Sequence, residues 1–170
     1  MDVRYLLLLT LSVVFFVPGC QEKTPEGFPK LIKNASVTVI QDGNPLADAK
    51  VTLYSDDPAI KWTIGGKTDA NGAAKLVTHG QYPGAPAGTF QVTVSKREEP
   101  QYQNQTPAPG QSDAEFMAAR AAENLSAYQL VDLSYGQRKT TKAVVEISDS
   151  NPGGTVDVGK AVREPIKESP

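Results

Sequence analysis

Lys67-Thr68-Asp69-Ala70-Asn71-Gly72-Ala73 is the stretch that decides the fold of this chain. Apolar residues alternate with polar ones on both sides of it, over residues 60–68 and 73–78. An Asn-Gly pair between two such segments is a strong signal for a β-hairpin, because both residues tolerate the positive φ of a tight turn. Asp69 can accept a hydrogen bond from the backbone two residues further on. The stretch therefore predicts a turn that joins two strands.

The same alternation predicts the other strands. The residues of 89–95 give the clearest pattern, with Phe90, Val92 and Val94 on one face, and we expect these three side chains in the core. Seven strands are predicted in all, over residues 35–41, 49–54, 60–68, 73–78, 89–95, 142–147 and 155–158. Many short strands in a chain of 170 residues favour one mostly β domain, a largely antiparallel β-sandwich over residues 35–158.

One helix is expected to interrupt the strands, over about residues 112–130. Ser112 and Glu115 have the spacing of a capping box, in which each side chain bonds the backbone amide of the other residue. Met117, Ala121, Leu125 and Tyr128 then recur at helical spacing. We expect this apolar stripe to pack on the sandwich, and the alternative is a helix that contacts a partner.

The first residues predict export and lipid anchoring. Residues 1–19 read as a signal peptide with an apolar run over 6–17, too short to span a membrane comfortably. Val17-Pro18-Gly19-Cys20 resembles the lipobox of bacterial lipoproteins, which implies a diacylglycerol on Cys20. The alternative is an ordinary secreted protein with a cysteine near its cleavage point. Residues 20–34 are expected to form a tether, and the polar residues 159–170 a flexible tail.

Composition excludes several functions. The net charge of −2, with 17 Lys and Arg against 19 Asp and Glu, argues against nucleic-acid binding. The densest charged cluster, Lys96-Arg97-Glu98-Glu99, is expected to be neutralised by its own two glutamates. One cysteine allows no intramolecular disulfide, and one histidine cannot build the usual histidine-rich metal or catalytic sites. We therefore predict no catalytic residue, metal or cofactor. His79 is expected in a surface or hydrogen-bonded role, with a general base as the alternative. Asp56 and Asp57 are expected in an Asp-Pro turn, with a calcium site as the alternative.

Three segments of the sequence resemble a known family. They are Gly43-Asn44-Pro45-Leu46-Ala47-Asp48-Ala49-Lys50-Val51-Thr52-Leu53, Thr68-Asp69-Ala70-Asn71-Gly72 and Gly88-Thr89-Phe90-Gln91-Val92-Thr93-Val94. Together they resemble the carboxypeptidase regulatory-like modules, and with the lipobox they look like the small lipoproteins of this class in planctomycete-type bacteria. The resemblance covers about residues 35–95. It implies a seven-stranded transthyretin-like (prealbumin-like) sandwich with no common catalytic activity.

These observations predict a non-enzymatic, lipid-anchored module of the cell envelope that binds or scaffolds an envelope protein. Gln21 after the cysteine favours the outer membrane, on its periplasmic or surface face. The alternative is a lipoprotein that binds a small ligand or carbohydrate and is associated with a transporter. An exposed cluster of Tyr54, Trp62 and Tyr82 would favour sugar binding, because sugars stack on aromatic faces. Burial of Trp62 would favour the scaffold.

Overall fold

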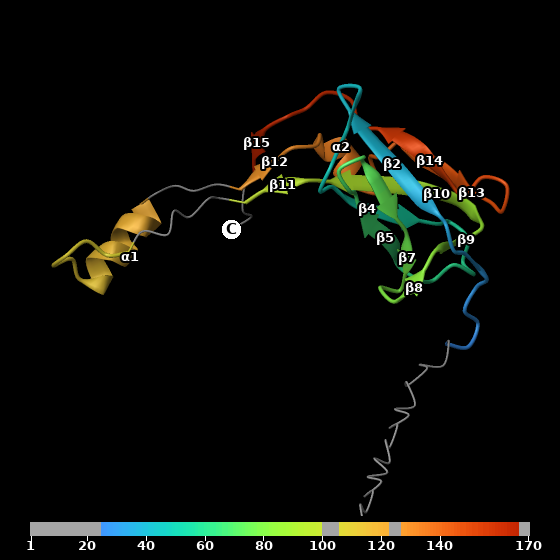
Figure 1. Ribbon diagram of the computed structural model, residues 1–170, viewed down its shortest axis with the longest axis horizontal. Helices are drawn as coiled ribbons and strands as arrows, with labels where there is room; N and C mark the ends of the chain where they lie inside the picture. Colours follow the sequence, from blue (N-terminus) through green and yellow to red (C-terminus); the bar gives the residue numbers. More distant parts are fainter. Residues whose placement is uncertain (1–24, 100–105, 123–126, 167–170) are drawn as a thin grey trace, which may run out of the picture.

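The computed structural model describes residues 25–99, 106–122 and 127–166 of the chain (Figure 1). The predicted signal peptide, residues 1–19, and Cys20 lie outside the described residues. Within the described part, no helix has both the length and the apolar character needed to cross a membrane. The helices are α1 (Asp113–Ala122) and α2 (Leu133–Gly136). The strands are β1 (Leu31–Ile32), β2 (Ser36–Gln41), β3 (Asn44–Pro45), β4 (Lys50–Tyr54), β5 (Ile64–Lys67), β6 (Ala73–Lys75), β7 (Val77–Thr78), β8 (Tyr82–Pro83), β9 (Ala85–Pro86), β10 (Gly88–Ser95), β11 (Arg97–Glu98), β12 (Tyr128–Gln129), β13 (Val144–Ile147), β14 (Gly153–Asp157) and β15 (Glu164–Pro165).

Two larger sheets enclose one hydrophobic core. One has the strand order β13-β10-β4-β5-β7-β8, and the other has the order β14-β2-β3 with β6 also paired to β2. Inward side chains of both sheets, among them Val39, Leu53 and Phe90, belong to a single buried cluster. The pairings within these sheets are antiparallel except that of β14 with β2. This mostly β architecture is compatible with the predicted sandwich, and the transthyretin-like topology stays a prediction.

The turn at residues 69–72 forms as predicted. The Asp69 carboxylate accepts hydrogen bonds from the amides of Asn71 (2.8 Å) and Ala73 (3.0 Å), and Gly72 has a φ of 73°. The strand after the turn is divided between the two sheets. Its β6 part pairs with β2, and its β7 part pairs with β5, Ile64 opposite Thr78. One continuous segment therefore connects the sheets.

The strand β10 also matches its prediction. Phe90, Val92 and Val94 are fully buried. The strand pairs with β4 on one side and with β13 on the other, so it lies inside its sheet. Both of its neighbours contribute further buried apolar side chains to the same cluster, Leu53 and Val145.

The segments expected to be a tether and a tail both contain strands. In the tether, β1 pairs with β9, and Phe28 precedes it in an aromatic cluster. In the tail, β15 pairs with β12. Two-residue strands have no alternation that sequence can reveal, because their order comes from partners distant in the chain.

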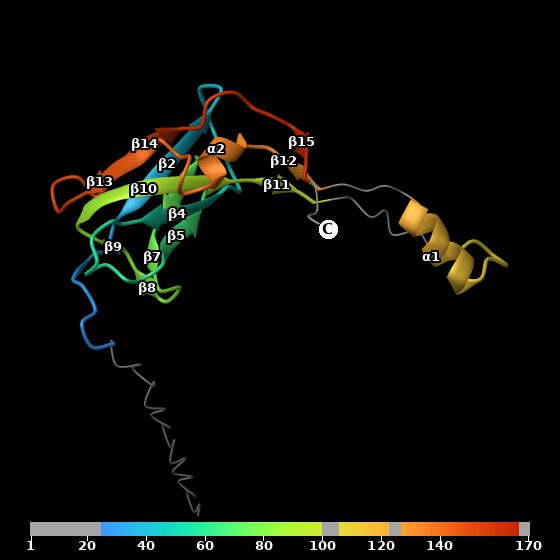
Figure 2. The ribbon, with the colours of Figure 1, turned by 180° about the vertical axis from the view of Figure 1, so that it is seen from behind.

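The helical insertion is shorter than the predicted range of 112–130. Its capping box is present: the Ser112 amide donates to Glu115 Oε2 (3.0 Å), and the Glu115 amide donates to Ser112 Oγ (3.3 Å). The predicted C-terminal end of this helix is wrong, because Tyr128 lies in β12, which pairs with β11. Leu125 lies outside the described residues. Both views show α1 standing apart from the sheets, and Met117 is 62% exposed, contrary to the expected packing (Figures 1 and 2).

Candidate functional site

The two ends of the domain carry different features. The tether strand β1 pairs with β9 directly before β10 begins at Gly88, and β10 ends at Ser95, close to β11. At about 3.3 Å per residue, the seven steps along β10 separate the two ends by about 23 Å. Figure 1 shows the same arrangement, with the blue chain leaving near β9 and the strands β11, β12 and β15 at the opposite side. We call these the tether end and the far end.

The tether end holds an aromatic cluster. The Phe28 ring lies 4.5 Å from the Tyr82 ring and 5.2 Å from the Trp62 ring, measured between centroids. Trp62 and Tyr82 are both half-buried. Phe28, a tether residue, thus packs against two of the three aromatics that were considered as a sugar platform. The third aromatic, Tyr54, instead contacts Arg138, whose Cζ lies 5.4 Å from the centre of the Tyr54 ring.

His79 borders the aromatic cluster and is exposed. Its ring meets Trp62 edge to face with the centroids 5.0 Å apart, and its backbone amide donates to the Thr63 carbonyl at 2.7 Å. Its φ of 57° belongs to a turn. None of the hollows described below includes His79 among its lining residues. The contacts of His79 in the described structure are those of a turn residue at the surface.

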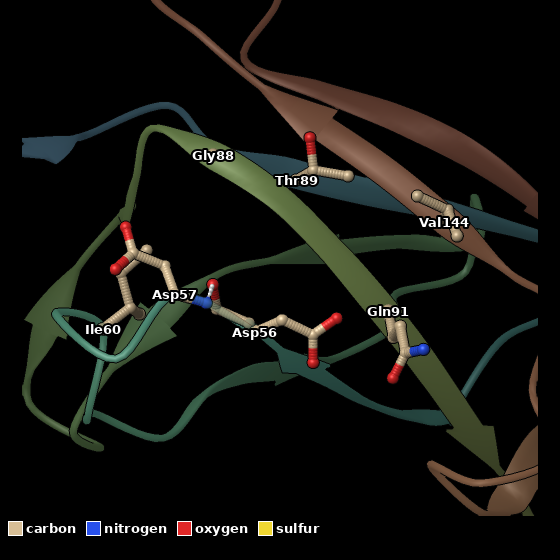
Figure 3. A pocket seen from close by; sticks show the side chains of 8 residues that line it. Asp56, Asp57, Ile60, Gly88, Thr89, Gln91 and Val144 are labelled. Atoms are coloured by element: carbon tan, nitrogen blue, oxygen red, sulfur yellow. Dashed lines mark hydrogen bonds between the residues drawn. The ribbon is translucent and has the colours of Figure 1, made fainter.

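A first hollow, of about 410 Å³, lies beside β10 nearer the tether end (Figure 3). Figure 3 shows Asp56 extending toward Gln91 of β10, with Val144 on the neighbouring strand β13. Arg138 Nη2 bonds both Asp56 Oδ1 (2.7 Å) and the Ser55 carbonyl (3.1 Å). The lining combines acidic, amide, hydroxyl and apolar groups, from Ser55, Asp56, Asp57, Ile60, Gly88, Thr89, Gln91 and Val144.

The carboxylates of this hollow already have partners within the chain. Asp57 Oδ1 accepts from the Ala59 amide at 2.8 Å, as expected for the predicted Asp-Pro turn, and Asp56 is paired with Arg138. Among the described residues there is no group of three or more His, Cys, Asp or Glu that could hold a metal ion. Calcium therefore has no further acidic ligand here beyond Asp56 and Asp57.

A second hollow, of about 600 Å³, lies at the far end of the same sheet, and we call it the basic hollow. It is lined by Asp48, Lys50, Lys67, Ser95, Lys96 and Arg97. The Lys67 Nζ lies 2.7 Å from Asp48 Oδ1, and the two lysines Lys67 and Lys96 hold the pKa of Asp48 below its ordinary value, mainly through the hydrogen bond from Lys67. Four cationic residues and a single carboxylate thus line this hollow, in a chain whose net charge is −2.

The far end also carries the base of the helical insertion. The strands β11, β12 and β15 form a small sheet there, so the chain leaves through β11 and returns beside it through β12. The Arg163 guanidinium lies 3.6 Å from the centre of the Tyr128 ring and bonds Glu98 at 3.1 Å, which lowers the pKa of Glu98 and raises that of Arg163. Arg163 directly precedes β15, so these contacts connect the start of β15 to both β11 and β12.

Sequence reasoning did not find the basic hollow or the small sheet. Lys96 and Arg97 were expected to be neutralised by the two glutamates that follow them, but Glu98 instead pairs with Arg163. One signal was available: alternation places Lys50 and Lys67 on the outer faces of strands predicted to be adjacent along the chain. Comparison with models of protein families, with curated proteins and with solved structures finds no match for this chain.

Proposed function

We propose that this chain is a non-enzymatic, lipid-anchored module of the cell envelope, of the carboxypeptidase regulatory-like, transthyretin-like class, which binds an envelope protein. The observation that supports this role is the separation of the two ends of the domain. The tether packs on the body through Phe28 and β1, whereas α1 and the basic hollow belong to the far end. A domain anchored at one end and carrying its exposed features at the other holds those features away from a membrane.

The exposed helix is the contact surface that we propose for the envelope protein. Helix α1 begins with a complete capping box, and its side chain Met117 is exposed. An apolar side chain of this size on a helix apart from the core is a suitable anchor for a partner, because burying it on binding removes apolar area from water. The small sheet of β11, β12 and β15 fixes the position at which the helical insertion leaves the body of the domain.

Chemical crosslinking in intact cells tests this proposal. The tagged protein is purified after crosslinking, and the attached proteins are identified by mass spectrometry. We expect one envelope protein at near-equal amount, lost in the variant Met117→Lys and kept in Leu133→Lys, a matched control because Leu133 of α2 is 52% exposed on the body of the domain. Recovery of no protein above background, or equal loss in both variants, would contradict a helix-mediated scaffold.

The anchor has a separate test. An intact-mass measurement of the protein purified from membranes should show acyl chains on Cys20. The variant Cys20→Ser should move the protein from the membrane fraction to the soluble fraction, because two or three acyl chains hold a domain firmly on a bilayer. An unmodified Cys20 in the wild-type protein would refute the anchor and leave the secreted alternative.

A carbohydrate- or small-ligand-binding lipoprotein remains the second candidate, and the first hollow is the observation that favours it. That hollow sets polar groups of Thr89 and Gln91 beside the apolar Ile60 and the exposed Val144. Sugars present both hydroxyl groups and apolar ring faces to a binding site. Screening the protein on immobilised glycans tests this function, with Gln91→Ala expected to abolish any binding at this hollow. Absence of binding to any glycan would remove the carbohydrate as the ligand of this candidate.

A further inference from the structure

The basic hollow is built on a row of residues that crosses three strands. Ser95 of β10 lies opposite Lys50 of β4, and Lys50 lies opposite Lys67 of β5. Directly opposite residues in a sheet project from the same face, about 4.5–5.5 Å apart at their Cβ atoms. The side chains of this row therefore stand together on the outer face, and Lys96 and Arg97 continue the positive charge beyond the strand end.

This arrangement costs stability. Like charges directly opposite each other in a sheet are destabilising, and Lys50 and Lys67 form such a pair. Asp48 relieves the repulsion only in part, because one carboxylate, paired with Lys67, shares the hollow with four cations. The chain as a whole carries nearly equal numbers of the two signs, 17 Lys and Arg against 19 Asp and Glu. A concentration of four of the 17 Lys and Arg residues in one hollow instead creates a local positive potential that attracts anions.

Asp48 is held firmly beside these cations. Its backbone amide donates to the Thr68 carbonyl at 3.0 Å, and the hydroxyl of Thr68 accepts from the amide of the next residue, Ala49, at 2.8 Å. Its φ of 60° fixes it in a turn conformation. The Asp48 carboxylate therefore lies where an external anion would otherwise contact Lys67.

We propose that the basic hollow binds a phosphate group carried by a soluble or glycan-borne ligand. A phosphate monoester carries about −1.5 to −2 charges at pH 7 and offers three acceptor oxygens, which suits a site where cations outnumber carboxylates. Three of the four cations are lysines, whose compact ammonium groups bind phosphate as point charges without the paired geometry that arginine imposes. The Ser95 hydroxyl adds a neutral donor to the same row.

The position of the hollow favours a ligand from outside the anchoring membrane. It lies at the far end, about 23 Å along β10 from the strand on which the tether packs. This step rests on the proposed anchor at Cys20, because only an anchored domain has a fixed direction relative to a bilayer. Binding itself does not depend on the anchor, so a failure of the lipid modification and a failure of phosphate binding would be distinguishable.

Titration calorimetry with pyrophosphate at low ionic strength tests the proposal on the full chain purified in a neutral detergent. We expect the double variant Lys50→Gln, Lys67→Gln to bind about tenfold more weakly, since removing each exposed cation weakens the attraction several-fold. The control Lys61→Gln, Lys75→Gln removes two exposed lysines outside the hollow and should bind as the wild type does. Added salt should weaken binding to the wild type.

The variant Asp48→Asn provides the opposite test. It removes the internal competitor while keeping the side-chain size, and asparagine tolerates the positive φ of this position. Pyrophosphate should then bind a few-fold more tightly. No binding by the wild type, or equal loss in the two double variants, would overturn the proposal. Binding confined to vesicles of phosphatidylglycerol would also overturn it, because it would assign these cations to a bilayer surface.

Discussion

The guanidinium of Arg163 lies over the ring of Tyr128 at 3.6 Å, and it ties the last described strand to the base of the helical insertion. The same guanidinium bonds Glu98, so one side chain contacts both β11 and β12. Arg163 and Glu98 lie 65 positions apart in the sequence. Arg163 therefore closes a small sheet whose strands are each only two residues long.

The variant Arg163→Gln should loosen this sheet locally. Its charge-assisted bond and its contact with the ring are both lost, and short strands have few backbone hydrogen bonds to compensate. Amide hydrogen exchange should become several-fold faster at Leu130 and Ile166. Their amides donate to the backbone carbonyls of Lys96 and Ala127, respectively. The control Lys160→Gln, in the same segment, should leave these rates unchanged. Unchanged exchange in Arg163→Gln would show that the backbone alone maintains the sheet.

The variant Phe28→Ala should release the tether from the body. Phe28 contacts the rings of Trp62 and Tyr82, and aromatic pairs contribute about 0.5–1.5 kcal/mol each beyond their buried area. Trp62 is the sole tryptophan, so its fluorescence reports on this contact directly. We expect a red shift of the emission and faster proteolysis before β1. An unchanged spectrum would contradict the packing of Phe28 on Trp62.

The variant Phe90→Ala should destabilise the whole domain. Phe90 is completely buried on β10, opposite Val145 of β13, and removing a buried phenylalanine ring costs about 3–5 kcal/mol in the free energy of unfolding. Denaturant unfolding measures this loss. Val144→Ala, on the neighbouring strand but 57% exposed, should change the free energy by less than about 1 kcal/mol. Similar losses in the two variants would place Phe90 outside the core.

The variants Gly72→Ala and Gly43→Ala should differ although both glycines have a positive φ. At Gly72 an added Cβ would lie 2.5 Å from the Val39 carbonyl oxygen, whereas at Gly43 it would meet nothing within 4 Å. The conformational strain, about 1–3 kcal/mol, applies to both, but only Gly72→Ala must also displace the backbone of β2. The denaturation midpoint should fall further for Gly72→Ala. Equal midpoints would contradict this close approach.

Acidification should weaken the start of α1. Hydrogen bonds from the Ser112 amide and hydroxyl hold the pKa of Glu115 below its ordinary value of 4.5. A carboxylate whose pKa is lowered by folding stabilises the helix fully above the unfolded value, and this contribution is lost as the pH falls through the folded pKa. Carbon chemical shifts of residues 113–118 should therefore lose helical character below about pH 4.5. Glu115→Gln should remove this pH dependence, and a persistent one would assign it to another group.

Local sequence predicted the features that depend on neighbouring residues. The turn at Asp69 to Gly72, the capping box of Ser112 and Glu115, and the inward face of β10 all form, because each is determined within a few positions. The division of the strand 73–78 between two sheets depends on β2, about 40 positions earlier, and no local pattern indicates it. The predicted packing of α1 was wrong for a related reason: an apolar stripe does not say whether a partner surface within the chain lies in reach.

The candidate sites were harder to predict than the fold. Lys50, Lys67 and Lys96 are each ordinary surface residues in sequence, and only the pairing of three strands brings them together. The charges of Lys96 and Arg97 were expected to be balanced by Glu98 and Glu99, but the partner of Glu98 is Arg163, from the segment expected to be a flexible tail. Side chains at adjacent positions of a strand point to opposite sides and contact different groups. Opposite charges that are neighbours in the sequence therefore do not always neutralise each other in the fold.

The strand that follows the Asn-Gly turn has a consequence for how the domain unfolds. Because its first part is hydrogen-bonded to β2 and its second part to β5, removing it would open both sheets at once. The two sheets should therefore lose their order in one cooperative transition. The helical insertion enters and leaves between β11 and β12, outside this shared strand. Insertions of other lengths at that point would leave the cooperative unit intact, so the far end of this domain is free to diversify while the body stays the same.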